Sequence, residues 1–337
     1  MKLDLIGDIH GELPALRTLL QALEHDLEGG RPHPEGRIPV FLGDLIDRGK
    51  YGIEVAELVS RAVREGRALC LMGNHEYNLV GWDLKLKRFE KAKKSNAATI
   101  ADVKERPARW RPVLDFFRSL PLSLELSDLR VVHACWHRES LEAIGERLEE
   151  PAADNPPVGR SSDGPAAALW EFVRHHSPFA GTERRRGLPG PLNGQDDPPH
   201  AVLLKGFEEP SAPFVDNDGK HRERIRSIWW NGDRSRVLHD RAQVVGHYWN
   251  LPPVAGEFMP PHPSGHHELR AWQEQTLADH PALRGNGLPS SGRQMDAPDI
   301  VCVDFNGVTR SAGNAACVGA LRWPEREVVW GLAERSF

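Results

Sequence analysis

The sequence predicts an α/β protein built on a parallel sheet. Three short apolar stretches, at residues 3–6, 38–42 and 68–72, each end in a polar loop, and residues 13–27 and 53–65 carry apolar side chains at helical spacing. Strand, loop and helix in repeated order are typical of βαβ units. The carboxyl ends of parallel strands converge at one edge of a sheet, so we expect the functional residues there.

Further elements follow residue 76 and complete one predicted domain over residues 1–337. The segment 76–120 is predicted to be mainly helical, and helices are also expected at 140–150 and 166–175. Later strands are expected at 129–133, 201–204, 225–230, 242–245, 300–303 and 328–331. Stretches rich in proline and glycine, at about 151–200 and 251–292, predict two insertions over the cleft.

Composition restricts the partners of the chain. Its 43 Lys and Arg against 48 Asp and Glu leave a net charge of −5, which does not favour binding to long nucleic acid. No apolar run is long enough to cross a bilayer, so no membrane partner is expected. The four cysteines form no Cys-x-x-Cys pair, and residues 1–6 lead directly into the first motif without a signal-peptide pattern. We therefore expect reduced, buried thiols and a cytoplasmic location.

Five polar clusters follow apolar stretches along the chain. They are Gly7-Asp8-Ile9-His10-Gly11, Gly43-Asp44-Leu45-Ile46-Asp47-Arg48-Gly49, Gly73-Asn74-His75-Glu76, His133 and His247. Hard oxygen donors and imidazoles, with a carboxylate to bridge two cations, are the ligands of a dinuclear metal site. Each residue alone has an ordinary explanation: Asp8 as a helix cap, Asp47 and Arg48 as a surface ion pair, Glu76 as a first-turn carboxylate. The clusters together favour the metal site.

These motifs and their order resemble the calcineurin-like metallophosphoesterases. The Gly-Asp-x-x-Asp-Arg-Gly form resembles the phosphoprotein-phosphatase branch, which includes bacterial protein phosphatases and diadenosine tetraphosphate hydrolases. The resemblance is close over residues 1–76 and then depends on short motifs around His133, His247 and Asp304. It implies a four-layer αββα sandwich of two mixed sheets flanked by helices.

The resemblance also implies a role for each motif residue. Two divalent ions are expected, with manganese favoured and iron or zinc as alternatives, and a shared hydroxide attacks phosphorus. The implied ligands of the first ion are Asp8, His10 and Asp44, and those of the second are Asp44, Asn74, His133 and His247. In the family, the residue matching His75 protonates the leaving group, that matching Asp47 orients it, and that matching Arg48 holds the phosphate. Asp304 resembles a carboxylate that supports the site from outside the ligand set.

The chain departs from the family pattern near the metal ligands. The chain has His133-Ala134-Cys135-Trp136 where many members have His-x-Gly or His-Gly-Gly, and the ring of Trp136 is expected to narrow the pocket or to offer a stacking face. Trp249 replaces the second histidine of the nuclease-like branches, which disfavours a nuclease. Lys205 and Arg226 lie in the interval where family members place additional phosphate-binding cations, and they are candidates for that role.

The function predicted is phosphomonoester hydrolysis, of the kind carried out by serine/threonine protein phosphatases, on a phosphorylated protein or nucleotide. The alternative is cleavage of a dinucleoside polyphosphate such as diadenosine tetraphosphate, favoured by Trp136 and the insertions. A non-catalytic binding module is a hypothesis of another class. The chain retains every ligand position and His75, which disfavours that hypothesis.

Overall fold

A computed structural model describes the chain over residues 1–86, 89, 96–145, 163–174, 179, 199–215, 221–226, 240–248, 293–294, 300–305 and 315–334. The first sheet has six strands in the order β10-β13-β12-β1-β2-β3. Their bounds are β1 Leu3–Ile6, β2 Ile38–Phe41, β3 Leu69–Cys70, β10 Arg293–Gln294, β12 Ala315–Trp323 and β13 Glu327–Glu334. The predicted parallel unit is β1-β2-β3, and the hairpin β12-β13 adds to β1 in antiparallel register.

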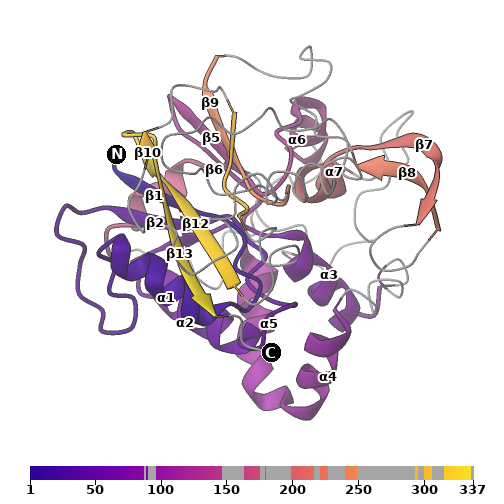
Figure 1. Ribbon diagram of the computed structural model, residues 1–337, viewed down its shortest axis with the longest axis horizontal. Coiled ribbons are helices and arrows are strands. Elements are labelled where there is room, and N and C mark those ends of the chain that lie inside the picture. The colour runs from indigo at the N-terminus through magenta and orange to yellow at the C-terminus, as the bar shows by residue number, and fades with distance from the viewer. Residues whose placement is uncertain are drawn as a thin grey trace.

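The second sheet has five strands in the order β11-β9-β5-β4-β6. Their bounds are β4 Ser123–Glu125, β5 Leu129–Val132, β6 Val173–Arg174, β9 Ala242–Val245 and β11 Ile300–Cys302. Here β5, β9 and β11 run parallel, and β4 pairs antiparallel with β5 and β6. A separate hairpin, β7 (Glu208–Val215) with β8 (His221–Arg226), extends at the edge of the molecule (Figure 1).

Helices flank the two sheets and give the predicted αββα arrangement (Figure 1). Their bounds are α1 Leu13–Ala22, α2 Gly52–Arg64, α3 Asn74–Asp83, α4 Ala97–Glu105, α5 Pro107–Ser119, α6 Arg138–Gly145 and α7 Pro199–Lys205, with a short 3₁₀ helix at Ala167–Glu171. The helix α1 packs on β12 and β13, and α2 packs on β3 and α5. No helix among the described residues is long and apolar enough to span a membrane.

The core lies on both faces of the central strands. All four residues of β1 are buried, and the apolar side of α1, including Leu16 and Leu19, faces the same sheet. Gly331 in β13 permits that approach, because a Cβ atom there would lie 2.3 Å from the Ala15 carbonyl oxygen. The four cysteines are free thiols and buried, as predicted.

Some sequence predictions need correction. Residues 201–204 belong to α7 rather than to a strand, because a short apolar run does not distinguish a buried helix from a strand. The first helix ends at Ala22 rather than 27, since Glu24 takes a left-handed φ of 61° and the His25 amide bonds back to Leu20. The segment 166–175 is a 3₁₀ turn followed by β6 instead of one helix. The insertion at 251–292 and most of that at 151–200 lie outside the described residues.

Candidate active site

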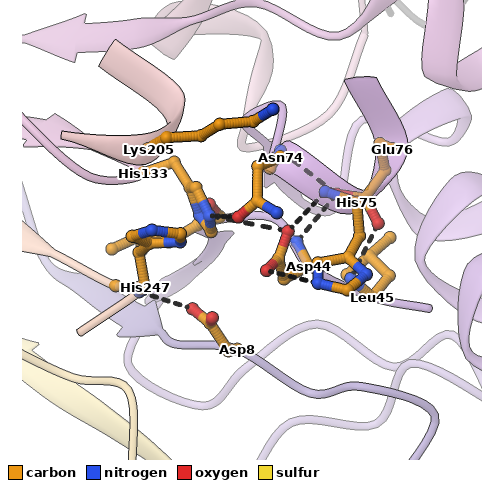
Figure 2. Close-up of polar contacts among 12 residues, drawn as sticks. Asp8, Asp44, Leu45, Asn74, His75, Glu76, His133, Lys205 and His247 are labelled. Atoms are coloured by element: carbon orange, nitrogen blue, oxygen red, sulfur yellow. Dashed lines mark hydrogen bonds and ion pairs between the residues drawn. The ribbon is translucent and has the colours of Figure 1, made fainter. Parts of the chain in front are cut away.

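The predicted ligands gather where five strands end. Asp8 follows β1, Asp44 follows β2 and Asn74 begins α3 just after β3, whereas His133 and His247 follow β5 and β9 of the other sheet. Figure 2 shows these side chains facing one another from both sheets. The convergence at the carboxyl ends of parallel strands is therefore as the strand pattern predicted.

One ring nitrogen of His10, Nε2, carries no proton and faces two carboxylates. The Nδ1–H of His10 donates to the Ile46 carbonyl oxygen at 2.9 Å, so Nε2 keeps its lone pair. That Nε2 atom lies 3.7 Å from Asp8 Oδ2 and 3.6 Å from Asp44 Oδ2, and it has no hydrogen-bond partner among the described residues although it is buried. A buried lone pair aimed between two carboxylates fits a cation ligand.

A second set of donors meets on the other side of Asp44. The Nδ1–H of His133 donates to the Leu42 carbonyl oxygen at 2.8 Å, so in the neutral ring Nε2 carries the lone pair, and it lies 3.2 Å from Asn74 Oδ1 and 3.5 Å from Asp44 Oδ1. Acceptors facing one another at these distances fit a cation between them. The His247 ring lies 5.1 Å from the His133 ring. Asp44 thus offers Oδ2 to one group and Oδ1 to the other, as a bridging ligand does.

Electrostatics in the site also fit bound cations. Burial, together with the nearby charges of Asp304 and Asp44, raises the pKa of Asp8 well above its usual range. Burial, followed by the charges of Arg48 and His75, lowers the pKa of His10. Buried carboxylates that repel one another are stabilised by divalent ions, and neutral imidazoles are ligands for them. Asp304 is fully buried and its charge acts on Asp8, and the supporting role that the resemblance implies for it stays a prediction.

The backbone around the ligands is held in an unusual conformation. Positive φ angles occur at His10 (49°), Asp44 (52°), Asp47 (68°), Arg48 (67°) and His247 (66°). Non-glycine residues rarely adopt this region, and such strain persists where surrounding structure enforces it, commonly at functional sites. Gly43, with a φ of 97°, directly precedes Asp44. Only glycine fits at this position, because a Cβ atom there would lie 2.3 Å from the Gly73 nitrogen.

Glu76 has a larger role than its position in the first turn of α3 predicted. Its carboxylate accepts the amide of Gly73 at 3.1 Å, which caps the helix. It also accepts the amides of Asp44 at 2.7 Å and Leu45 at 2.9 Å, and so fastens the loop after β2 to α3. Burial and then the charge of Asp44 raise the pKa of Glu76 to about 7.

His75 and Asp47 form the predicted pair. His75 Nδ1 lies 2.6 Å from Asp47 Oδ2, and His75 Nε2 lies 3.8 Å from Asp44 Oδ2 at the centre of the site. The main-chain amide of His75 donates to Asp44 Oδ1 at 2.9 Å. Asn96 and Thr99 also bond to Asp47, and sequence reasoning missed both because nothing near them in the chain marks a contact with a loop about fifty residues away.

The remaining candidates differ in their placement. Arg48 is exposed at the edge of the site, and Lys205 ends α7 with Nζ 3.3 Å from Asn78 Oδ1, above Asn74 and His133 in Figure 2. Trp136 is buried and the Arg130 guanidinium lies over its ring at 5.3 Å, so the ring does not present the open stacking face expected. Arg226 ends β8, and its side chain, like Trp249, falls outside the description.

Comparison with known proteins shows what the chain is similar to. The family model for calcineurin-like phosphoesterases matches residues 1–204. An asymmetrical bis(5'-nucleosyl)-tetraphosphatase PrpE from Bacillus velezensis is 31% identical over 264 residues, covering 72% of this chain and 99% of the relative. Its namesake from Halalkalibacterium halodurans is 29% identical over 196 residues, covering 53% of this chain and 79% of the relative. A solved yeast serine/threonine phosphatase with similarity to human PP5 aligns over 100% of this chain and 81% of its own, with 16% identity and a TM-score of 0.42.

Proposed function

This chain belongs to the calcineurin-like phosphoesterase family and is a phosphoric ester hydrolase, and we propose that it hydrolyses phosphomonoesters at a dinuclear metal site with His75 as the general acid. The observation that carries this proposal is the buried His75–Asp47 pair. The His75 imidazole is held by a 2.6 Å hydrogen bond from its Nδ1 to Asp47 Oδ2, and its Nε2 faces the centre of the ligand cluster.

The ligand roles follow from the two donor groups. Asp8, His10 and Asp44 would hold one divalent ion, and Asp44 with Asn74, His133 and His247 would hold the second. Such a pair of ions supplies Lewis acidity to phosphate oxygens and a water that loses its proton near neutral pH. We propose manganese, with iron and zinc as the ions that elemental analysis must distinguish from it.

The protein's own groups handle the leaving oxygen and the phosphate. His75 donates its Nε2 proton to the oxygen that departs from phosphorus, while the Asp47 carboxylate keeps the ring in place and stabilises its charged form. Arg48, exposed at the rim and close enough to influence Asp8 and His10, binds phosphate oxygens through its planar guanidinium.

Two substrate classes remain to be distinguished. A positioned acid matters most for a strongly basic leaving group such as the alkoxide of serine, which supports a phosphorylated protein as the substrate. The names of the two relatives support a dinucleoside tetraphosphate instead. Lys205 at the rim favours that second candidate as well, because it adds a cation for a substrate with several phosphates.

The test compares kcat/KM of manganese-loaded protein on a phosphoserine peptide and on diadenosine tetraphosphate, with Asp44→Asn as the blank. A higher value on the peptide supports the protein phosphatase, and a higher value on the dinucleotide supports the tetraphosphatase. Absence of Asp44-dependent turnover on both, in protein shown by elemental analysis to carry metal, would overturn the catalytic proposal in favour of a binding module.

A further inference from the structure

The start of α4 supplies two side chains to the His75–Asp47 pair. Asn96 lies at the N-terminal boundary of α4, and its Nδ2 donates both to Asp47 Oδ2 and to the His75 carbonyl oxygen, the latter at 3.2 Å. Thr99, in the first turn of the helix, donates its hydroxyl to Asp47 Oδ1. Both residues are buried, with 1% and 7% exposure. None of the motifs in the sequence includes either residue.

We propose that Asn96 and Thr99 are positioning residues for proton transfer by His75. They act through Asp47 and touch neither phosphate nor metal in this proposal. The inference rests on the proposed function, because it presumes that His75 protonates the leaving oxygen.

The geometry of the carboxylate supports this role. Asp47 accepts three side-chain donors: Thr99 on Oδ1, and His75 and Asn96 on Oδ2. With Thr99 on one oxygen and Asn96 on the other, the carboxylate cannot rotate without breaking a hydrogen bond. Asp47 is only 4% exposed, so water does not readily replace a lost donor. The plane of the carboxylate, and with it the direction of the His75 ring, is therefore set by α4.

Asn96 adds a second constraint. One amide group contacts both members of the pair, the side chain of Asp47 and the main chain of His75, so it fixes their separation. Its own main chain is anchored, because its carbonyl oxygen accepts the Ile100 amide at 2.8 Å within the first turn of α4. Small misplacement of a catalytic group lowers the rate strongly, which makes such an anchor consequential for catalysis.

A purely structural role for these bonds makes a different prediction. If they only attach α4 to the body, their loss lowers turnover of every substrate equally. If they position the acid, their loss penalises a strongly basic leaving group and spares a weakly basic one, since a weak base departs without a proton. The dependence of rate on the leaving group therefore separates the two roles.

The experiment measures kcat/KM of the full-length, metal-loaded protein on 4-nitrophenyl phosphate and on an alkyl phosphate. Thr99→Val removes the hydroxyl group and keeps the shape of the side chain, Thr99→Ser keeps the hydroxyl group, and Asn96→Ala removes the side-chain amide. We expect Thr99→Val and Asn96→Ala to lose about tenfold on the alkyl ester, part of the roughly 10²–10⁴-fold that a positioned acid supplies, and less than about threefold on the nitrophenyl ester. Thr99→Ser should retain wild-type values.

Two further variants make the outcomes separable. His75→Asn removes the proposed acid itself and so gives the full size of the leaving-group effect. Thr18→Val is the matched control for Thr99→Val: it removes a threonine hydroxyl in α1, where that hydroxyl donates to the Pro14 carbonyl oxygen at 3.2 Å. If His75→Asn slows both esters equally, the proposed acid role of His75 is wrong. If His75→Asn discriminates between the esters but Thr99→Val and Asn96→Ala do not, the positioning inference alone is wrong.

A readout that needs no turnover completes the test. In protein loaded with diamagnetic zinc, the proton on His75 Nδ1, in a 2.6 Å hydrogen bond to a buried carboxylate, should give a low-field NMR resonance that is absent in His75→Asn. We expect it to move upfield or exchange faster in Thr99→Val and Asn96→Ala and to persist in Thr99→Ser. An unchanged resonance in either donor-deleted variant that folds would overturn the inference.

Discussion

At the scale of single residues, the loops of the site are held by one carboxylate that lies outside the predicted ligand set. Glu76 accepts main-chain amides of Asp44, Leu45 and Gly73, and so it joins the loops after β2 and β3. Asp44 is the bridging carboxylate of the proposed metal site, and its left-handed backbone is compatible with only a narrow range of loop conformations. We infer that Glu76 keeps this conformation in place.

The first prediction follows for Glu76→Gln. An amide nitrogen in place of one carboxylate oxygen faces a main-chain N–H, so at least one buried donor loses its acceptor. We expect the free energy of unfolding to fall by about 1–3 kcal/mol, measured by urea denaturation, and manganese affinity to fall roughly 10- to 100-fold. The control is Glu57→Gln, which alters a partly exposed pair with Arg109 and should cost less than about 1 kcal/mol. Equal losses in the two variants would contradict this role for Glu76.

At the scale of elements, a buried charge network fastens the end of β1 opposite the site. Asp4 lies within β1 and is fully buried, with Arg37 Nε at 2.9 Å and His25 Nε2 at 2.7 Å. Arg37 also reaches both oxygens of Glu325 at 3.0 Å, in the turn between β12 and β13. The network therefore joins the start of β1 and the segment before β2 to the closing hairpin.

His33 belongs to the same buried network, but its ring nitrogens are not arranged as metal ligands. His33 Nε2 bonds to the Leu23 carbonyl oxygen at 2.8 Å, and Nδ1 accepts the Glu35 amide at 3.0 Å. Both ring nitrogens are thus used by the main chain, whereas a ligand needs one nitrogen free for the ion. Asp4 and Arg37 are better explained as a structural pair.

The second prediction concerns Arg37→Met. It leaves the Asp4 carboxylate buried with its main cation removed, and breaking one side of a buried pair typically costs about 3–5 kcal/mol. Urea denaturation should show this loss, while the metal content stays at the wild-type value because the network is remote from the ligands. In the double variant Asp4→Asn/Arg37→Met the unpaired charge is gone, so the loss should be smaller than the sum of the single losses. Additive losses would mean that the two side chains do not interact energetically.

The third prediction concerns the contact between α1 and β13. A methyl group at residue 331 would meet the Ala15 carbonyl oxygen and the Leu19 nitrogen at 2.3 Å, so Gly331→Ala forces the helix away from the sheet. We expect a loss of about 1–3 kcal/mol by thermal or urea unfolding. Gly52→Ala is the matched control, because its Cβ meets nothing closer than 3.6 Å at the first position of α2, where alanine favours the helix. A Gly331→Ala protein as stable as Gly52→Ala would contradict the packing described.

The parts of the fold that the sequence predicted are those whose signals are local. The strands before Asp8, Asp44 and Asn74 are apolar runs that end in recognisable motifs, so strand and loop are both encoded within a few residues. The contacts of Asn96 and Thr99 with Asp47 span 49 and 52 residues and depend on where α4 packs, which no local pattern specifies. The strand predicted at residues 201–204 was wrong for a related reason. Their burial can be predicted from the apolar sequence, but packing decides that their backbone is helical.

At the scale of the whole molecule, the site lies between two separately built sheets. The first sheet contributes Asp8, Asp44 and Asn74, and the second contributes His133 and His247. Direct bonds across this junction include the His247 amide to Asp8 Oδ1 at 3.1 Å and His133 Nδ1 to the Leu42 carbonyl oxygen at 2.8 Å. Ions that share ligands from both sheets would add bonds across the same junction.

The last prediction is therefore that metal removal destabilises the whole fold rather than one loop. An ion that binds only the folded state at about 100-fold above its Kd stabilises it by about 2.7 kcal/mol. Chelation should accordingly lower Tm by several degrees in a calorimetric scan, and added manganese should restore it. His133→Asn removes a ligand of the second sheet, so its Tm should respond less to chelator and to manganese. If chelation leaves the Tm of metal-containing wild-type protein unchanged, the ions bind without joining the two sheets. The junction between the sheets would then depend on the direct hydrogen bonds and apolar packing alone.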